Sequence, residues 1–324
     1  MIVVTGGAGF IGSAIVWRLN QLGENKIIIV DELGTDEKWK NLVPLKFDDL
    51  IHKDDFISMV IDGEVDFDIS AIIHMGANSS TTEKNADLLF SNNYLYSKEL
   101  AKFCLDKNIR FIYASSAATY GDGSLGFDDD ESKLETFRPL NMYGYSKQMF
   151  DLWAKRNKVF DKIVGLKYFN VYGPNEYHKG DMRSVVHKAF DQVRSAGKVK
   201  LFKSPNPKYK DGEQLRDFIY IKDAVEMTLF FLNKPDKNGL YNVGTGKARN
   251  WNDLVTALFK AVGKPVNIEY IELPHHLIEK YQYFTEANMN KIKNAGYSNA
   301  ITSIEDGVSD YVKNYLLGNQ YLEA

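Results

Sequence analysis

The sequence is poor in cysteine and in charge of one sign. Cys104 is the only cysteine among 324 residues, and one thiol can neither close an internal disulfide nor supply a cysteine-rich metal cluster. The 40 Lys and Arg residues nearly balance the 43 Asp and Glu residues, leaving a net charge of −3. Because no polybasic surface is indicated, we expect neither nucleic acid nor an anionic membrane as a partner. We also expect no bound metal, since the single cysteine cannot form a metal cluster.

Long apolar runs are also missing. No apolar stretch approaches the roughly 18 residues that a membrane helix requires. The chain opens on the strand-like residues 1–4, which leaves no room for the charged and apolar regions of a secretory signal. We therefore expect a protein of the cytoplasm, with enough length for one large domain or a domain with an appended lobe.

Glycine, by contrast, is concentrated near the start of the sequence. The β-branched residues 2–5 lead into Gly6, Gly7, Gly9 and Gly12, and a helical pattern follows. A strand, a glycine-rich turn and a helix in this order form a dinucleotide-binding fingerprint. Glycine permits the tight turn and lets a diphosphate approach the backbone, while the N-terminus of the helix attracts negative charge. The sequence therefore predicts a dinucleotide cofactor at this turn.

The residues after the second predicted strand leave the choice of cofactor open. Residues 26–30 are predicted as a strand that is continuously apolar after Lys26, as in a buried parallel sheet, and Asp31 follows them. A carboxylate at this distance from the glycines binds ribose hydroxyls and favours NAD, because it repels a 2′-phosphate. Lys38 and Lys53 could each bring an ammonium to such a phosphate, or could be ordinary solvated lysines.

Three more strands are predicted at residues 71–75, 111–116 and 163–169. The first ends in a small, hydroxyl-rich loop, residues 76–82, and the second ends at Ser116. Ligands of doubly wound sheets bind at the carboxyl ends of the strands, so both ends are candidate ligand contacts. We interpret His74 as a core histidine with satisfied hydrogen bonds, and Ser116 as a hydrogen-bonding group rather than an acylated nucleophile.

The central chemical motif is Tyr143-Gly144-Tyr145-Ser146-Lys147. If it opens a helix, Tyr143 and Lys147 lie one turn apart on the same face. A neighbouring ammonium favours the phenolate, which brings proton abstraction from an alcohol toward working pH. Nineteen tyrosines make a chance match easy, so this interpretation depends on the surrounding motifs.

The glycine turn, Ser116 and Tyr143-x-x-x-Lys147, in this order, resemble the extended short-chain dehydrogenase/reductase (NAD-dependent epimerase/dehydratase) superfamily. Residues 4–13, 79–83, 92–94, 113–121, 169–174, 178–180, 216–218, 242–246 and 281–285 further resemble the ADP-L-glycero-D-manno-heptose 6-epimerase family. The resemblance implies an α/β fold, a doubly wound parallel Rossmann sheet with a smaller C-terminal α/β substrate lobe. Residues 1–172, with returning segments at about 215–248, would bind NADP, and the remainder of 173–324 would bind substrate.

The resemblance also implies the residues of the site. Tyr143 and Lys179 would be two catalytic bases, Ser116 would polarise the reacting oxygen, and Lys147 would lower the pKa of Tyr143. NADP, with NAD as the other choice, would be held by Gly6, Gly9, Phe10, Ile11, Gly12, Asp31, Glu32, Lys38, Lys53, Met75, Gly76, Ala77, Asn78, Ser79, Asn92, Tyr143, Lys147, Val171 and Lys179. The substrate would contact Asn170, Asp181, Lys188, Phe202, Lys203, Ser204, Pro205, Arg216 and Tyr281.

The implied reaction is inversion at C6 of an ADP-linked heptose through a transient ketone, for synthesis of lipopolysaccharide core precursors. The implied partner is a small nucleotide sugar, and the implied assembly is a homo-oligomer such as a pentamer. The sequence departs from the family at Lys188, where histidine is more frequent, at Asn78, where cysteine is common, and in the longer segment 205–214.

The motifs leave other functions open. The enzyme could be another NAD(P)-dependent nucleotide-sugar epimerase or dehydratase, although Ala117 and Ala118 follow Ser116 where a dehydratase has a carboxylate pair. A non-catalytic nucleotide-sugar-binding protein is a further alternative. Among single residues, Lys179 could be a solvated surface lysine, Arg216 could pair with Asp217, and Tyr281 could be a packed aromatic.

Overall fold

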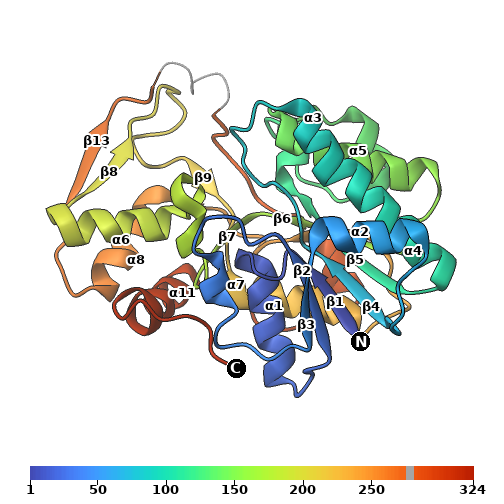
Figure 1. The fold of residues 1–324 in the computed structure, drawn as a ribbon. Coiled ribbons are helices and arrows are strands. Elements are labelled where there is room, and N and C mark those ends of the chain that lie inside the picture. The colour runs from blue at the N-terminus through green and yellow to red at the C-terminus, as the bar shows by residue number, and fades with distance from the viewer. Residues whose placement is uncertain (275–280) are drawn as a thin grey trace.

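The computed structural model describes residues 1–274 and 281–324, and its centre is a seven-stranded sheet in which every pairing is parallel (Figure 1). The strand order is β11-β6-β5-β4-β1-β2-β3. The bounds are β1 Ile2–Thr5, β2 Ile27–Asp31, β3 Asp49–His52, β4 Ala71–His74, β5 Arg110–Ser116, β6 Val164–Tyr168 and β11 Gly239–Val243. The predicted doubly wound parallel sheet is confirmed.

The strand order reverses beside β1, which creates the place where a ligand can bind. From β1 the chain builds β2 and β3 on one side, and it then crosses to build β4, β5 and β6 on the other. Loops leaving β1 and β4 therefore diverge, and the crevice between them lies at the carboxyl edge of the sheet. All residues of β1, β2 and β4 are buried, which explains their apolar sequences.

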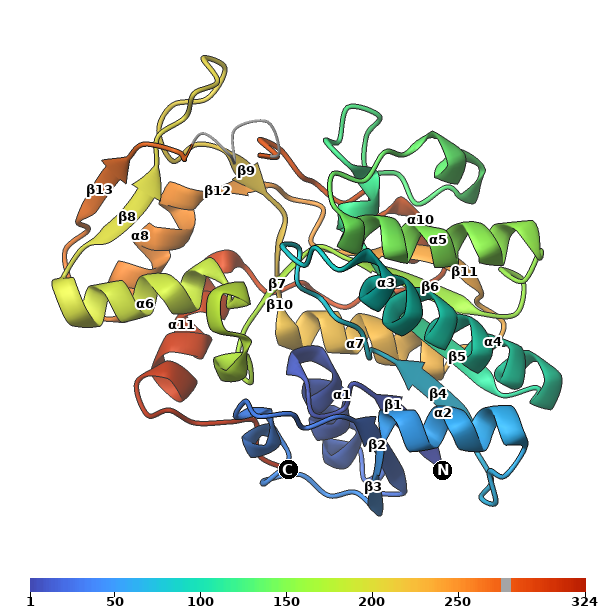
Figure 2. The same ribbon diagram turned by 45° about the horizontal axis from the view of Figure 1, so that its top comes forward.

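Helices cover both faces of this sheet. Helix α1 (Phe10–Gln21) packs beside α7 (Ile221–Leu232) on one face, while α2 (Lys53–Asp62), α4 (Tyr96–Lys107) and α5 (Met142–Arg156) cover the other (Figure 2). The buried apolar residues form two hydrophobic clusters, the first including α1 and the second including α4, and α7 contributes to both. Cys104 is buried in the second core, on α4. None of the helices in the described part of the chain has the length and apolar character needed to cross a membrane.

Later elements gather at one end of the molecule, at the left of Figure 1. They include three two-stranded sheets, β7 with β10, β9 with β12 and β8 with β13. Their bounds are β7 Asn170–Tyr172, β8 Val199–Phe202, β9 Leu215–Arg216, β10 Phe218–Tyr220, β12 Arg249–Asn250 and β13 Ile268–Ile271, with helices α6 Val185–Ala196, α8 Trp251–Ala261 and α11 Ile304–Tyr311. The predicted division between cofactor-binding and substrate-binding segments stays a prediction.

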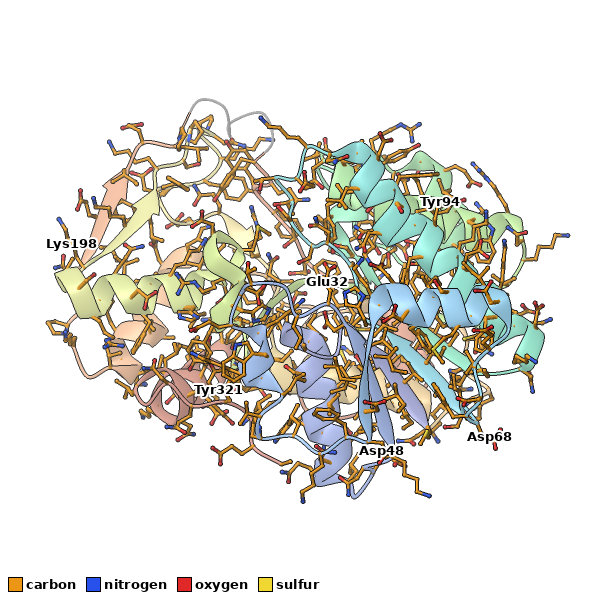
Figure 3. All side chains as sticks on the ribbon, in the orientation of Figure 1. Glu32, Asp48, Asp68, Tyr94, Lys198 and Tyr321 are labelled. Carbon is orange, nitrogen blue, oxygen red and sulfur yellow. The ribbon has the colours of Figure 1, made fainter. Side chains whose placement is uncertain are left out.

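Shorter elements complete the chain. Helix α3 (Ala86–Leu89) continues through a π-helical turn, η2 (Phe90–Leu95), into α4, and α10 spans Asn290–Asn294. The remaining short helices are η1 Lys38–Asn41, η3 Ala117–Tyr120, η4 Glu131–Thr136, η5 Tyr177–Met182 and η6 Val312–Leu316. In Figure 3, Glu32 lies near the middle of the view, whereas Asp48, Asp68 and Lys198 lie toward its outer edge. Glu32 is exposed and lines the cavity described below.

Candidate active site

The glycine turn between β1 and α1 is packed so tightly that side chains would not fit. A Cβ atom on Gly12 would lie 2.1 Å from the carbonyl oxygen of Gly6. Gly6 adopts a φ of +66°, and a Cβ there would lie 2.6 Å from the backbone nitrogen of Gly76. The turn therefore lies directly against the end of β4, and its backbone is accessible to a diphosphate from the crevice side.

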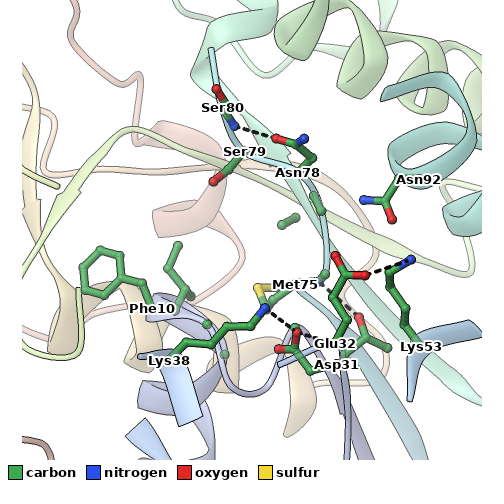
Figure 4. Close-up of a pocket in the computed structure, with 18 of the residues that line it drawn as sticks. Phe10, Asp31, Glu32, Lys38, Lys53, Met75, Asn78, Ser79, Ser80 and Asn92 are labelled. Atoms are coloured by element: carbon green, nitrogen blue, oxygen red, sulfur yellow. Dashed lines mark hydrogen bonds and ion pairs between the residues drawn. The ribbon is translucent and has the colours of Figure 1, made fainter. Parts of the chain in front are cut away.

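A cavity of about 460 Å³ opens between this turn and the ends of β2, β4, β5 and β6 (Figure 4). Its lining contains almost the whole predicted cofactor set: Gly6, Gly9, Phe10, Ile11, Gly12, Asp31, Glu32, Lys38, Lys53, Met75, Gly76, Ala77, Asn78, Ser79, Asn92, Tyr143, Lys147 and Lys179. Val171 lies on β7 and packs against the hydrophobic cores, so its contact with a cofactor stays a prediction.

One end of the cavity has the features of an adenosine-ribose site. The Asp31 carboxylate accepts a hydrogen bond from the backbone of Ala8 at 2.9 Å, which fixes it beside the glycine turn. Lys38 pairs with the same carboxylate at 2.9 Å, and Lys53 lies 3.3 Å from Glu32 (Figure 4). Two ammonium groups and two carboxylates thus meet at this end of the cavity.

At the other end, the predicted base motif opens a helix as expected. The side chain of Asn141 accepts a hydrogen bond from the backbone N–H of Gly144 at 2.8 Å and caps α5, so Tyr143 and Lys147 lie in its first turns. Burial raises the pKa of Tyr143, and a hydrogen bond with Ser116 lowers it in part. Burial also lowers the pKa of Lys147 to about 8, against the opposing effect of Asp151. Tyr143 and Lys147 line the cavity, whereas Ser116 is buried at the end of β5 and is not part of the cavity lining.

Lys179 enters the cavity from the opposite side, on η5. Its ammonium lies 5.3 Å from the centre of the Phe10 ring, beside the glycine turn. Burial lowers the pKa of Lys179, while the neighbouring Glu176 raises it. Lys179 is thus a cavity residue rather than a solvated surface lysine.

The predicted substrate residues lie outside this cavity lining, among the later elements. Arg216 is buried, and its guanidinium carbon lies 5.3 Å from the Tyr281 ring centre and 5.6 Å from that of Trp251. Elsewhere in the set, Lys188 donates to the carbonyl of Asp181. Lys203 is paired with Glu272 at 2.6 Å, Ser204 donates to the Asn206 carbonyl, and Phe202 ends β8. Asn170 is exposed on β7, and Pro205 lies in the loop that follows β8.

Two interpretations of single residues can now be decided. The carboxylate of Asp217 accepts hydrogen bonds from the backbone of Thr245, Gly246 and Ala287, so the alternative of an Arg216–Asp217 ion pair is wrong. His74 is a core histidine, as predicted, with Thr5 Oγ1 at 2.6 Å and Ser97 Oγ at 2.8 Å from its ring nitrogens. Burial lowers the pKa of His74 to about 3, so the ring is neutral.

Sequence reasoning missed several lining residues, chiefly Tyr96, Tyr168 and His178. The signal for Tyr168 was available, since it is the last residue of β6 and therefore points to the carboxyl edge. His178 could have been predicted from its place beside Lys179. Across residues 1–274 and 281–324, the structure contains no cluster of three or more His, Cys, Asp or Glu able to hold a metal ion.

Known proteins with similar sequences share this organisation. The model of the NAD dependent epimerase/dehydratase family matches residues 2–244. Proteins named ADP-L-glycero-D-manno-heptose-6-epimerase from Nitratidesulfovibrio vulgaris and Fusobacterium nucleatum are 57% and 51% identical, each over 98% of both chains. The Helicobacter pylori protein of that name has a crystal structure with a TM-score of 0.82 and 30% identity, covering 97% of this chain and 95% of that one.

A cofactor is seen in a more distant structure. UDP-glucose 4-epimerase from Thermus thermophilus, crystallised with NAD, has a TM-score of 0.73 and 25% identity over 96% of this chain and 97% of that one. With the family match, this indicates a nicotinamide cofactor and a nucleotide sugar as substrate. The chain belongs to the NAD dependent epimerase/dehydratase family and, within it, to the group of ADP-L-glycero-D-manno-heptose-6-epimerases.

Proposed function

We propose that the protein interconverts ADP-D-glycero-D-manno-heptose and ADP-L-glycero-D-manno-heptose by transient oxidation at C6. The observation that carries this proposal is the placement of Tyr143 with Lys147 and of Lys179 in the walls of one cavity that also contains the glycine turn. Inversion of a carbinol carbon requires the transient ketone to present its other face for return of the hydride, which moves the oxygen to a second position, so two acid–base groups in one cavity suit the reaction.

The chain's residues fit a bound nicotinamide cofactor, because the glycine turn lines the cavity and is packed too closely to carry side chains, which leaves its backbone facing the place that a diphosphate would take. When bound, that cofactor accepts the C6 hydride and returns it. Tyr143, kept close to the ammonium of Lys147, exchanges a proton with the C6 oxygen on one face, and Lys179 does so on the other. Ser116 would donate a hydrogen bond to the same oxygen, and it lowers the pKa of Tyr143 in part.

The rival reaction, dehydration, is disfavoured by the residues that follow Ser116. Ala117 and Ala118 begin η3 directly after β5, and the Ala118 backbone N–H donates to Ser116 Oγ at 3.1 Å. Elimination needs a carboxyl group at this point to move a proton on the neighbouring carbon. An alanine pair cannot do this, which favours epimerisation.

We also propose NADP rather than NAD as the cofactor, because Lys38 and Lys53 lie together at the ribose end of the cavity. Changing both to methionine is expected to lower the affinity for NADP by about 10²–10⁴-fold, since each of the two charged hydrogen bonds to a phosphate contributes about 1.5–3 kcal/mol. NAD affinity should change little. Calorimetric titration of cofactor-stripped protein with each nucleotide measures the two affinities.

The matched control for this pair is Lys40→Met. Lys40 lies on the same short helix as Lys38 but pairs with the exposed Glu37 at 2.7 Å. Its replacement should leave both affinities unchanged. Equal losses for NADP and NAD in the double variant would contradict the proposed role in phosphate recognition.

The decisive experiment is incubation of the purified protein with ADP-D-glycero-D-manno-heptose while the C6 configuration is followed by NMR. The bound nucleotide is released from a second sample and identified by mass. Conversion to the L-glycero epimer, with NADP recovered, is the expected result. Bound cofactor without conversion would overturn the substrate assignment. Sedimentation of the same sample tests the homo-oligomer, for which the resemblance to the family is the only support.

A further inference from the structure

A fully buried ion pair joins α5 and β6 next to the residues proposed for catalysis. Asp151 on α5 and Lys167 on β6 are both 0% exposed, with Lys167 Nζ 2.7 Å from Asp151 Oδ2. The carboxylate also accepts hydrogen bonds from Tyr113 OH at 2.8 Å and Ser115 Oγ at 2.7 Å. The ammonium donates to Thr119 Oγ1 at 2.6 Å. Each charge is therefore held by groups from several elements.

These contacts join the elements that carry the proposed catalytic residues. Ser115 precedes Ser116 at the end of β5, and Thr119 Oγ1 donates to the carbonyl of Ser116 at 2.8 Å. Asp151 lies one turn beyond Lys147 on the same face of α5. The pair thus links the strand end that presents the serine to the helix face that presents the tyrosine and lysine.

Stability alone is a poor reason for such a pair. Removing two charges from water costs several kcal/mol per ion, and replacing a buried pair by apolar groups is often neutral or stabilising. We propose that Asp151 and Lys167 are a positioning pair that keeps Ser116 aligned with Tyr143 and sets the charge of Lys147, a role that rests on the proposed function.

The other titratable groups that face Lys147 carry no charge that could replace the influence of Asp151 and Lys167 on it. His74 on β4 is neutral, because its pKa is lowered to about 3 by burial. Burial raises the pKa of the tyrosines on β5, α5 and β6, so they are uncharged: Tyr113, Tyr143 and Tyr168. Lys179 also lines the cavity, but it lies on η5 beside Phe10, and neither partner of the pair is on that element. Asp151 is the carboxylate on the helix face of Lys147, and Lys167 balances its charge.

The test separates charge from structure by removing each partner alone. In Asp151→Asn the uncompensated Lys167 disfavours a charged Lys147, so the alkaline limb of the kcat profile should move to lower pH by about one unit. In Lys167→Met the uncompensated carboxylate favours a charged Lys147, so the limb should move to higher pH. In the double variant both charges are absent, so the alkaline limb should return toward its original position. If one single variant does not fold, the double variant, which leaves no unpaired buried charge, still allows the test.

A second readout does not depend on turnover. The pKa of Lys147 in the holoprotein is followed by the chemical shift of its Cε in [ε-¹³C]lysine-labelled protein, with the signal assigned by its loss in Lys147→Arg. Shifts of opposite sign in the two single variants are expected here too. If the protein is inactive on ADP-heptose, the proposed function is refuted, but the pKa measurement still tests whether the pair sets the charge of Lys147.

The matched control is Lys222 with Asp310, a half-buried pair at 2.7 Å outside the cavity lining. Lys222→Met and Asp310→Asn should lower the melting temperature without moving either titration. The proposal would be overturned if Asp151→Asn and Lys167→Met lowered the melting temperature without moving the pKa of Lys147. It would also be overturned if the two variants moved that pKa in the same direction.

Discussion

Replacing Tyr143 by phenylalanine is expected to lower kcat by about 10²–10⁴-fold, the contribution typical of a positioned general acid or base. The change removes one oxygen, the hydroxyl that hydrogen-bonds with Ser116 and would exchange the proton with the substrate. The ring remains in its half-buried place on α5, so the fold and the bound cofactor should be retained. Initial rates of C6 inversion, measured by NMR, give the effect.

Tyr145→Phe is the control for this prediction. It removes the same oxygen two residues away, but Tyr145 is 48% exposed, so activity should be unchanged. Lys179→Met should lower kcat to a similar extent as Tyr143→Phe, because either single variant leaves one face without a base. Undiminished turnover in a protein carrying both changes would refute the two-base mechanism.

Gly12→Ala is expected to release the cofactor, the second large effect. The added methyl group would lie 2.1 Å from the Gly6 carbonyl oxygen, within the turn that would receive the diphosphate. Forcing an extra carbon into a packed site typically costs about 1–3 kcal/mol and shifts the backbone. Nucleotide content per protein chain, measured after heat release, should fall to near zero, and the urea midpoint should fall with it.

Gly9→Ala provides the graded comparison. Its added carbon would meet the same Gly6 oxygen at 3.1 Å, a contact that a small shift can relieve. A smaller loss of nucleotide is therefore expected than for Gly12→Ala. The reverse order, or full cofactor content in Gly12→Ala, would show that the turn adapts and that its close packing does not govern binding.

The sequence was most informative where a residue's role is set by its immediate neighbours. The apolar residues 71–73 form most of a buried strand, and the spacing of the glycines was enough to place Gly12 where helix α1 packs against the glycine turn. Strand β3 was not predicted, because this edge strand is only partly buried and its polar residues Asp49 and His52 hide the strand pattern.

Long-range contacts were harder to predict from the sequence. Nothing near Asp217 indicates that backbone groups 28 to 70 residues away would occupy its carboxylate and leave Arg216 to the rings of Trp251 and Tyr281. The partnership of Asp151 with Lys167 likewise depends on a helix crossing a strand. The fold places the predicted substrate residues in the later elements, and their contacts with a nucleotide sugar remain predictions.

The burial of Cys104 makes the protein convenient for labelling. Cys104 lies on the buried face of α4 and is 1% exposed, and burial raises the pKa of its thiol, so the reactive thiolate is scarce. A maleimide dye should therefore leave the natural chain unmodified. A cysteine introduced at an exposed position would accept a single fluorophore without prior removal of the native one, which opens the movements of this enzyme to fluorescence measurements.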